Sequence, residues 1–91
     1  MTGIIDIKAL TDWLWTLEAR GRYDGDWVTE KLESFGVGGF DYRDTEVSGM
    51  VLSSDLARTL APDHYDGGYG GWGFQHQANV RAINRLATQI L

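Results

Sequence analysis

Residues 6–20, which read DIKALTDWLWTLEAR, decide how this chain begins to fold. Four apolar side chains recur there at the spacing of one helix face: Ile7, Leu10, Leu14 and Leu17. The pattern predicts an amphipathic helix over 6–20 that Gly21 ends. Trp13 and Trp15 flank the apolar face and lie about 200° apart around the helix, so one core surface does not easily cover both indoles.

A second helix is predicted to follow a turn at 23–25, with Asp26 as its N-cap and Gly36 as its end. Its apolar face would carry Val28, Leu32 and Phe35. Beyond it, apolar and polar residues alternate. This alternation predicts two short strands, near 39–43 and 46–52, paired as a hairpin.

Two further helices are predicted in the second half of the chain. A short one spans 55–61, with Ser53 or Ser54 as its cap and Pro62 as its end. A glycine-rich loop over 63–74 then leads into a long helix over 75–91. The prediction is one compact α+β domain over 1–91. It is predominantly helical, with long first and last helices around a short β-hairpin or small antiparallel sheet.

Composition limits the classes of protein that this chain can represent. It has 91 residues, of which 43% are apolar and 23% charged, so disorder throughout is not expected. It has no cysteine, which excludes disulfides, thiolate zinc sites and thiol catalysis. We find neither a signal peptide nor an apolar run long enough to span a bilayer, and we therefore expect a cytoplasmic protein without membrane association.

Acidic residues gather in one part of the chain. Thirteen acids and eight bases give a net charge of −5, and the excess falls within residues 1–46. Seven carboxylates lie close together in sequence: Asp24, Asp26, Glu30, Glu33, Asp41, Asp44 and Glu46. Phosphate binding needs clustered cations, so direct nucleic-acid binding is not expected. The segment could instead be steered to a basic surface of another protein, or could simply keep the domain soluble.

The loop over 63–74 interleaves glycine with the rings of Tyr65, Tyr69 and Trp72. Such a loop could form a contact surface, or it could fold back and fill the small core. It also contains a G-x-G-x-x-G run, but no buried strand precedes the run and no acid follows about 20 residues later. Dinucleotide binding is therefore not expected.

His64, Asp66 and His76 could converge on a divalent metal ion. The Asp63–His64 pair followed by Asn79 resembles the HNH endonuclease pattern over residues 63–84. That resemblance implies a metal-dependent nuclease or hydrolase. The sequence departs from the pattern, because the pair follows a proline in a loop and no histidine stands at the expected helix position. The alternative for His76 is a buried, hydrogen-bonded side chain.

We expect a non-enzymatic protein-binding module, without a cofactor, that acts as an inhibitor or adaptor on a basic partner such as nucleic-acid-handling machinery. The seven carboxylates would meet that partner together with exposed rings from Trp13 or Trp15 and from Tyr65, Tyr69 and Trp72. The chain would be a monomer or a homodimer. A third alternative is a homo-oligomeric assembly subunit whose apolar helix face a second copy completes.

Overall fold

The structure is a computed structural model that describes residues 4–67 and 70–89. Within these residues the chain forms α1 (Ile7–Trp15), β1 (Arg22–Asp24), α2 (Gly25–Ser34), β2 (Glu46–Ser48), α3 (Gly49–Leu60) and α4 (Trp72–Gln89). The predicted α+β class is confirmed, since helices predominate and the two strands form an antiparallel sheet. The predicted contact residue Tyr69 lies outside the described residues.

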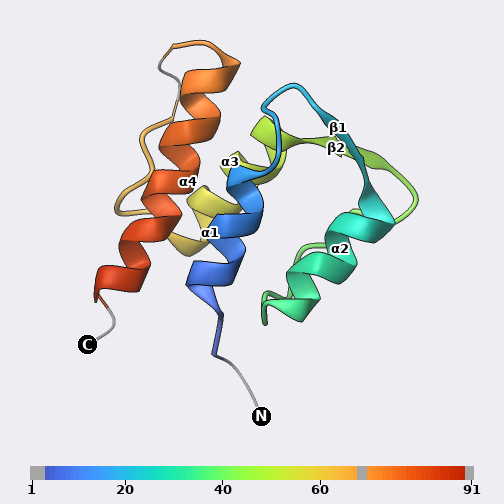
Figure 1. The fold of residues 1–91 in the computed structure, drawn as a ribbon, viewed down its shortest axis with the longest axis horizontal. Coiled ribbons are helices and arrows are strands. Elements are labelled where there is room, and N and C mark those ends of the chain that lie inside the picture. The colour runs from blue at the N-terminus through green and yellow to red at the C-terminus, as the bar shows by residue number, and fades with distance from the viewer. Residues whose placement is uncertain (1–3, 68–69, 90–91) are drawn as a thin grey trace.

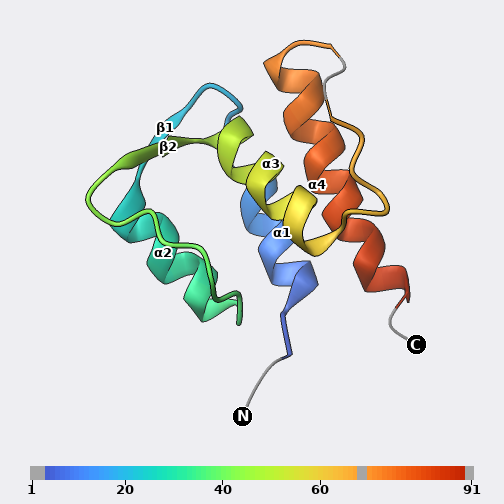
Figure 2. The same cartoon turned by 180° about the vertical axis from the view of Figure 1, so that it is seen from behind.

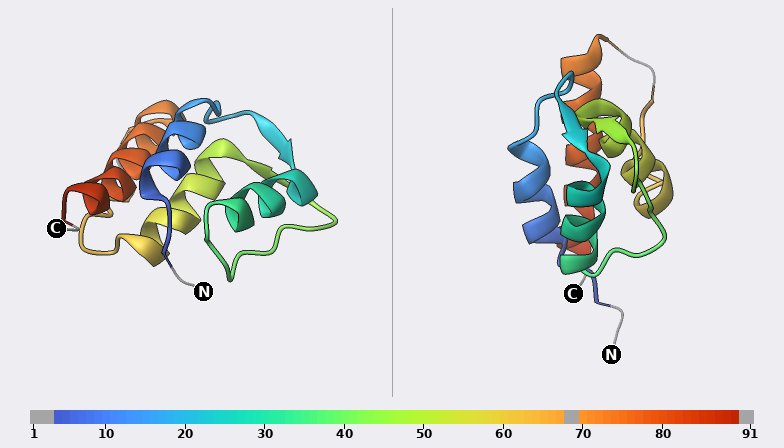
Figure 3. Two further views of the ribbon diagram at one scale, coloured as in Figure 1. Left: turned by 60° about the horizontal axis from the view of Figure 1, so that its bottom comes forward. Right: turned by 90° about the vertical axis from the view of Figure 1, so that its right-hand side faces the viewer.

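The helices lie side by side in a flat molecule. Figures 1 and 2 show α4 at one side, α2 at the other, and α1 and α3 between them. The two views in Figure 3 show how thin the molecule is, and its principal extents are 33 × 30 × 19 Å. The Cα radius of gyration is 12.3 Å. A compact chain of this length is expected to have a value of about 12 Å.

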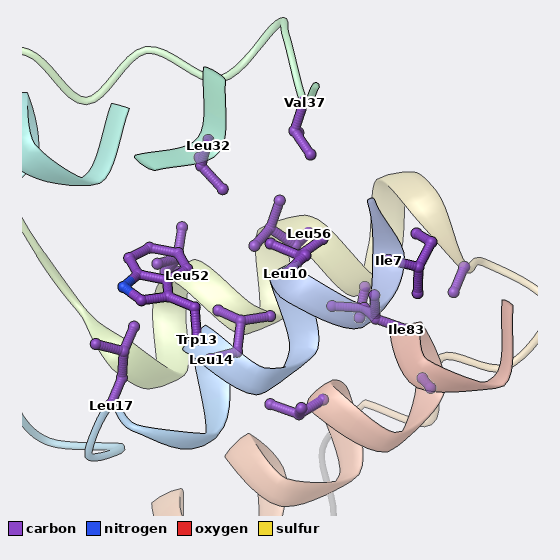
Figure 4. Packing of buried hydrophobic residues seen from close by; sticks show 14 of the residues in the cluster. Ile7, Leu10, Trp13, Leu14, Leu17, Leu32, Val37, Leu52, Leu56 and Ile83 are labelled. Carbon is purple, nitrogen blue, oxygen red and sulfur yellow. The ribbon is translucent and has the colours of Figure 1, made fainter. Parts of the chain in front are cut away.

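The core lies between α1 and α3 and is closed by α4, which packs closely against both of these helices, while α2 covers another side of it (Figure 4). The predicted apolar face of the first helix is confirmed, because its four members are buried. Leu52 and Leu56 of α3 and Val80 and Ile83 of α4 pack against it and are fully buried. Burial of each such side chain stabilises the folded state by roughly 1.5–3 kcal/mol, so the packing of these apolar residues holds most of the fold together.

Helix α1 ends at Trp15, before the predicted end at Gly21, because hydrogen bonds from elsewhere replace those of a further turn. The Leu14 carbonyl oxygen accepts from Leu17 N at 3.1 Å and from His76 Nε2 at 3.2 Å. Glu18 N, which would continue the helix by bonding to Leu14, donates to Tyr23 Oη at 2.8 Å. The predicted helix over 6–20 is therefore wrong in its last turn.

Helix α3 begins at Gly49, much earlier than predicted, because its first N–H groups have partners in the segment after α1. Met50 N donates to Ala19 O at 2.9 Å and Gly49 N donates to Gly21 O at 3.1 Å. Ser48 is the N-cap, and its side chain accepts from Val51 N. The predicted caps Ser53 and Ser54 are wrong, since both side chains point into the interior.

The two strands pair differently from the prediction. Tyr23 lies opposite Val47, so β1 occupies residues predicted to be a turn. The predicted strand over 39–43 is wrong, because the segment around it bonds to α2: Tyr42 N donates to Thr29 Oγ1 at 2.9 Å. Helix α2 starts at Gly25 rather than after Asp26, since the Asp24 carboxylate caps it by accepting from Trp27 N.

Candidate protein-binding surface

The seven predicted carboxylates are all exposed, and the structure brings them together on α2 and the segment 41–46 beside it. Asp26, Glu30 and Glu33 are spaced by four and three residues, so they share the outer face of α2. Asp44 N donates to Asp26 Oδ1 at 3.0 Å, which joins the loop to that face. We call the seven residues the acidic face: Asp24, Asp26, Glu30, Glu33, Asp41, Asp44 and Glu46.

Gly25 allows the two parts of the acidic face to approach each other. Its N–H donates to Thr45 O at 2.8 Å, and a Cβ atom at this position would overlap the Tyr42 carbonyl oxygen. Asp44 holds a left-handed backbone with φ of 65°, a conformation that aspartate tolerates better than most residues. Backbone contacts therefore fix the loop against the start of α2.

Cations neutralise only part of the acidic face. Arg43 pairs with Glu33 at 3.2 Å and Asp41 at 3.4 Å, and Arg22 pairs with Glu46 at 3.1 Å. The hydrogen bond and charge of Glu33, followed by those of Asp41, raise the pKa of Arg43. These pairs are exposed, so each adds little stability.

The other four carboxylates form no ion pair in the part of the chain that the structure describes. They are Asp24, Asp26, Glu30 and Asp44. Asp24 and Asp26 lie at the N-terminus of α2, where the helix dipole stabilises negative charge. The strongest negative potential of the face is therefore expected at this end of α2, near β1 (Figure 1).

The structure separates the two tryptophans of the first helix as their spacing predicts. Trp13 is 8% exposed and packs between Trp27 and Phe35, whose ring centroids lie 5.6 Å and 5.7 Å away. The prediction of Trp13 as a contact residue is therefore wrong, because this small core needs its volume. Trp15 is 44% exposed.

Sequence reasoning missed Trp27, the aromatic residue beside the acidic face. Its side chain is 41% exposed, directly follows Asp26 and leans on Tyr23 with ring centroids 6.0 Å apart. The sequence did carry a signal for its exposure. Trp27 lies one residue before Val28, where the apolar face of the second helix begins, just as the exposed Trp15 lies one residue after Leu14 of the first helix.

The other predicted contact rings lie on the α4 side of the molecule. Trp15 and Trp72 are exposed, and Tyr65 is partly buried against the core. A guanidinium lies over each ring: Arg81 is 6.0 Å from the Trp15 centroid, Arg20 is 4.8 Å from Trp72 and Arg58 is 5.9 Å from Tyr65. Trp72 shares a hollow with Glu46 of the acidic face, whereas Trp15 and Tyr65 are not among the residues that line it.

The predicted metal ligands are not brought together. His76 is buried, with Nδ1 2.9 Å from Ser53 Oγ and Nε2 3.2 Å from Leu14 O, whereas His64 and Asp66 line a hollow of about 250 Å³ beside Arg81. Over residues 4–67 and 70–89, no three histidine or acidic side chains are placed to hold a metal ion. The alternative interpretation of His76 as a buried, hydrogen-bonded side chain is confirmed.

His76 belongs to a buried polar network between α3 and α4 that the sequence analysis did not find. Asn79 Nδ2 donates to Ser53 Oγ at 3.0 Å and to Ser54 Oγ at 2.8 Å, and Gln75 Nε2 donates to Asn79 Oδ1 at 2.8 Å. The Ser53–His76 pair resembles a nucleophile and its base, but Ser53 is fully buried. The network joins α4 to α3 through buried hydrogen bonds.

No described helix combines the length and apolar character needed to cross a membrane. Comparison with protein-family models, with curated proteins and with solved structures finds no match to this chain.

Proposed function

We propose that this protein is a protein-binding module that occupies a basic surface of a partner protein, as an inhibitor or an adaptor. The observation that carries the proposal is the position of Trp27. This exposed indole lies directly beside the carboxylates at the start of α2 that have no ion-pair partner. Negative potential would speed the encounter with a basic surface, and a buried indole would lengthen the life of the complex.

The spacing of the acids favours a partner that handles nucleic acid. Asp26, Glu30 and Glu33 span about 10 Å of helix axis at 1.5 Å per residue. A strand of DNA carries one phosphate per roughly 3.4 Å, whereas these carboxylates lie about 5 Å apart along the axis, so the row resembles a phosphate backbone in sign and in linear arrangement rather than in charge density. A groove lined with lysine and arginine for phosphates could accept this face in place of its substrate.

Neutralising variants test the electrostatic part of the proposal. Asp26→Asn, Glu30→Gln and Asp44→Asn together remove three charges while keeping the side-chain shapes. Asp12→Asn, Glu18→Gln and Asp63→Asn together remove the same number of charges from exposed positions outside the acidic face. Proteins captured from a source lysate at low and high salt would be identified by mass spectrometry, and association rates would then be measured with the purified partner.

The acidic-face variant should associate at least about tenfold more slowly at low salt and lose most of its salt dependence, while the control variant keeps both. Equal effects of the two variants would show that only total charge matters, and would contradict the proposal.

Trp27→Ala and Trp15→Ala form a matched pair, because the two indoles are almost equally exposed. Trp27→Ala should weaken binding by more than about 1 kcal/mol, mainly through faster dissociation, and Trp15→Ala should leave it unchanged. The melting temperature of each variant separates loss of binding from loss of folding. A folded Trp27→Ala variant with unchanged affinity would remove Trp27 from the proposed surface.

A further inference from the structure

A hollow of about 320 Å³ opens between α3, the end of the glycine-rich loop and the start of α4. Its volume is at the lower end of the range of small-molecule sites, about 300–1,000 Å³. The described residues that line it are uncharged: Met50, Ser54, Tyr65, Gly70, Gly71, Trp72 and Gln75. It therefore differs in chemistry from the acidic face.

Two aromatic rings and two glycines shape the hollow. Tyr65 packs against the core, and Trp72 has the Arg20 guanidinium 4.8 Å from its ring centroid. Arg20 lines a neighbouring hollow that also contacts Trp72, so the cation supports this wall from outside. A Cβ at Gly71 would meet nothing within 4 Å, which keeps this side open. These features suit a flat ligand that stacks on a ring.

Two deeply buried polar side chains reach the hollow. Ser54 is 8% exposed and Gln75 is 7% exposed, yet both line it. Ser54 Oγ accepts from Asn79 Nδ2 and donates to the thioether of Met50 at 3.4 Å. Because a thioether is a weak acceptor, a carbonyl oxygen entering the hollow would offer the Ser54 hydroxyl a better one.

We propose that this hollow binds a small, uncharged, planar molecule that bears a carbonyl group, such as an aromatic amide. Its ring would lie against Trp72 and Tyr65, and its carbonyl oxygen would accept from Ser54 Oγ. The described residues that line the hollow include no cation to pair with a carboxylate, and the guanidiniums of Arg20 and Arg58 lie over Trp72 and Tyr65 without lining it, so a charged analogue should bind more weakly. This proposal is independent of protein binding by the acidic face.

The experiment uses benzamide as the probe and follows the backbone amide resonances of the full chain by NMR. Benzoate carries a charge in place of the amide, and toluene keeps the ring without a carbonyl. Benzamide should shift the resonances of Ser54, Gly71 and Gln75 and bind about tenfold more tightly than either analogue. Shifts outside this group, no saturable shift, or equal binding of benzoate or toluene would overturn the proposal.

Two variants test where benzamide binds, and a third serves as the control. Ser54→Ala should weaken benzamide about tenfold while leaving toluene unchanged. Trp72→Leu should weaken both probes, and Ser34→Ala, an exposed serine on α2, should affect neither. If Ser54→Ala does not fold, Trp72→Leu still decides the site. Unchanged benzamide binding by folded Trp72→Leu would overturn the proposal.

Discussion

The rings of Trp13 and Trp27 meet edge to face, with centroids 5.6 Å apart and planes inclined at 68°. Trp13 belongs to the core on α1, and Trp27 is exposed on α2 beside the acidic face. The contact orders the exposed indole in advance, which lowers the entropy that binding would otherwise cost. The contact therefore links the stability of the fold to the shape of the proposed binding surface.

Trp13→Phe should destabilise the protein much less than Trp13→Ala. Nε1 of Trp13 is buried and has no hydrogen-bond partner among the described residues, so losing this N–H offsets part of the lost packing. We expect a loss of about 1–2 kcal/mol for phenylalanine and about 3–5 kcal/mol for alanine in the free energy of unfolding by urea. Because both variants lose this N–H, the difference between them measures the packing of the ring, and equal losses would contradict the prediction.

Gly25→Ala should destabilise the fold and loosen the acidic face, because the added methyl group would collide with backbone rather than with a movable side chain. We expect a loss of about 1–3 kcal/mol in the free energy of unfolding and faster hydrogen exchange at the Asp44 amide. Gly38→Ala is the control, since a Cβ there meets nothing within 4 Å. Equal behaviour of the two variants would rule out the close approach.

Asn79→Leu should lower stability strongly, although leucine is similar in size. The change removes three buried hydrogen bonds, namely those that Asn79 donates to Ser53 and Ser54 and the one that it accepts from Gln75. Each buried hydrogen bond lost in this way costs about 1–3 kcal/mol. Gln77→Leu is the control on the same helix, because Gln77 is exposed and its side chain accepts from the exposed Arg81. Thermal unfolding would measure both, and a neutral Asn79→Leu would mean that waters replace the lost partners.

Tyr42 should make the fold sensitive to alkali. Burial, and then its 2.8 Å hydrogen bond to Asp55 Oδ2, raise the pKa of Tyr42 well above its ordinary value. The unfolded chain would lose this proton near pH 10, while the folded chain would still hold it, so stability should fall as the pH rises above about 10. Below that pH the contribution of Tyr42 is fully present.

Tyr42→Phe should reduce this alkaline loss. The measurement is the free energy of unfolding of both proteins from about pH 8 to about pH 11. Parallel curves over the whole range would show that Tyr42 titrates alike in the folded and unfolded chains.

The sequence predicted the parts of the fold that depend on local periodicity. The apolar face of the first helix and the opposite placement of Trp13 and Trp15 follow from the helical repeat. The last helix is also present, and it begins at Trp72 rather than at 75. The predicted ends of helices were wrong where a group at the end bonds to a residue far along the chain, as Met50 N does to Ala19 O. Strand β1 has three residues, too few for an alternating pattern to show.

The candidate surface was predictable only in part. Charge alone predicted the exposure of the acidic residues. The joining of α2 to the segment 41–46 depends on the close approach at Gly25, which has no signature in sequence. Trp27 was missed because the apolar face of its helix was read from Val28 onward. The buried network was missed because Gln75, His76 and Asn79 extend the apolar face of the last helix with polar residues at the same spacing.

The hydrogen bond from His76 to Leu14 has a consequence for biosynthesis. The ribosome releases residue 14 long before residue 76, which lies 62 positions later. Until α4 emerges, the Leu14 carbonyl lacks this partner, although Tyr23 can already accept from Glu18 N and end the helix. The domain should therefore complete the hydrogen bonding of its core only after α4 has been translated.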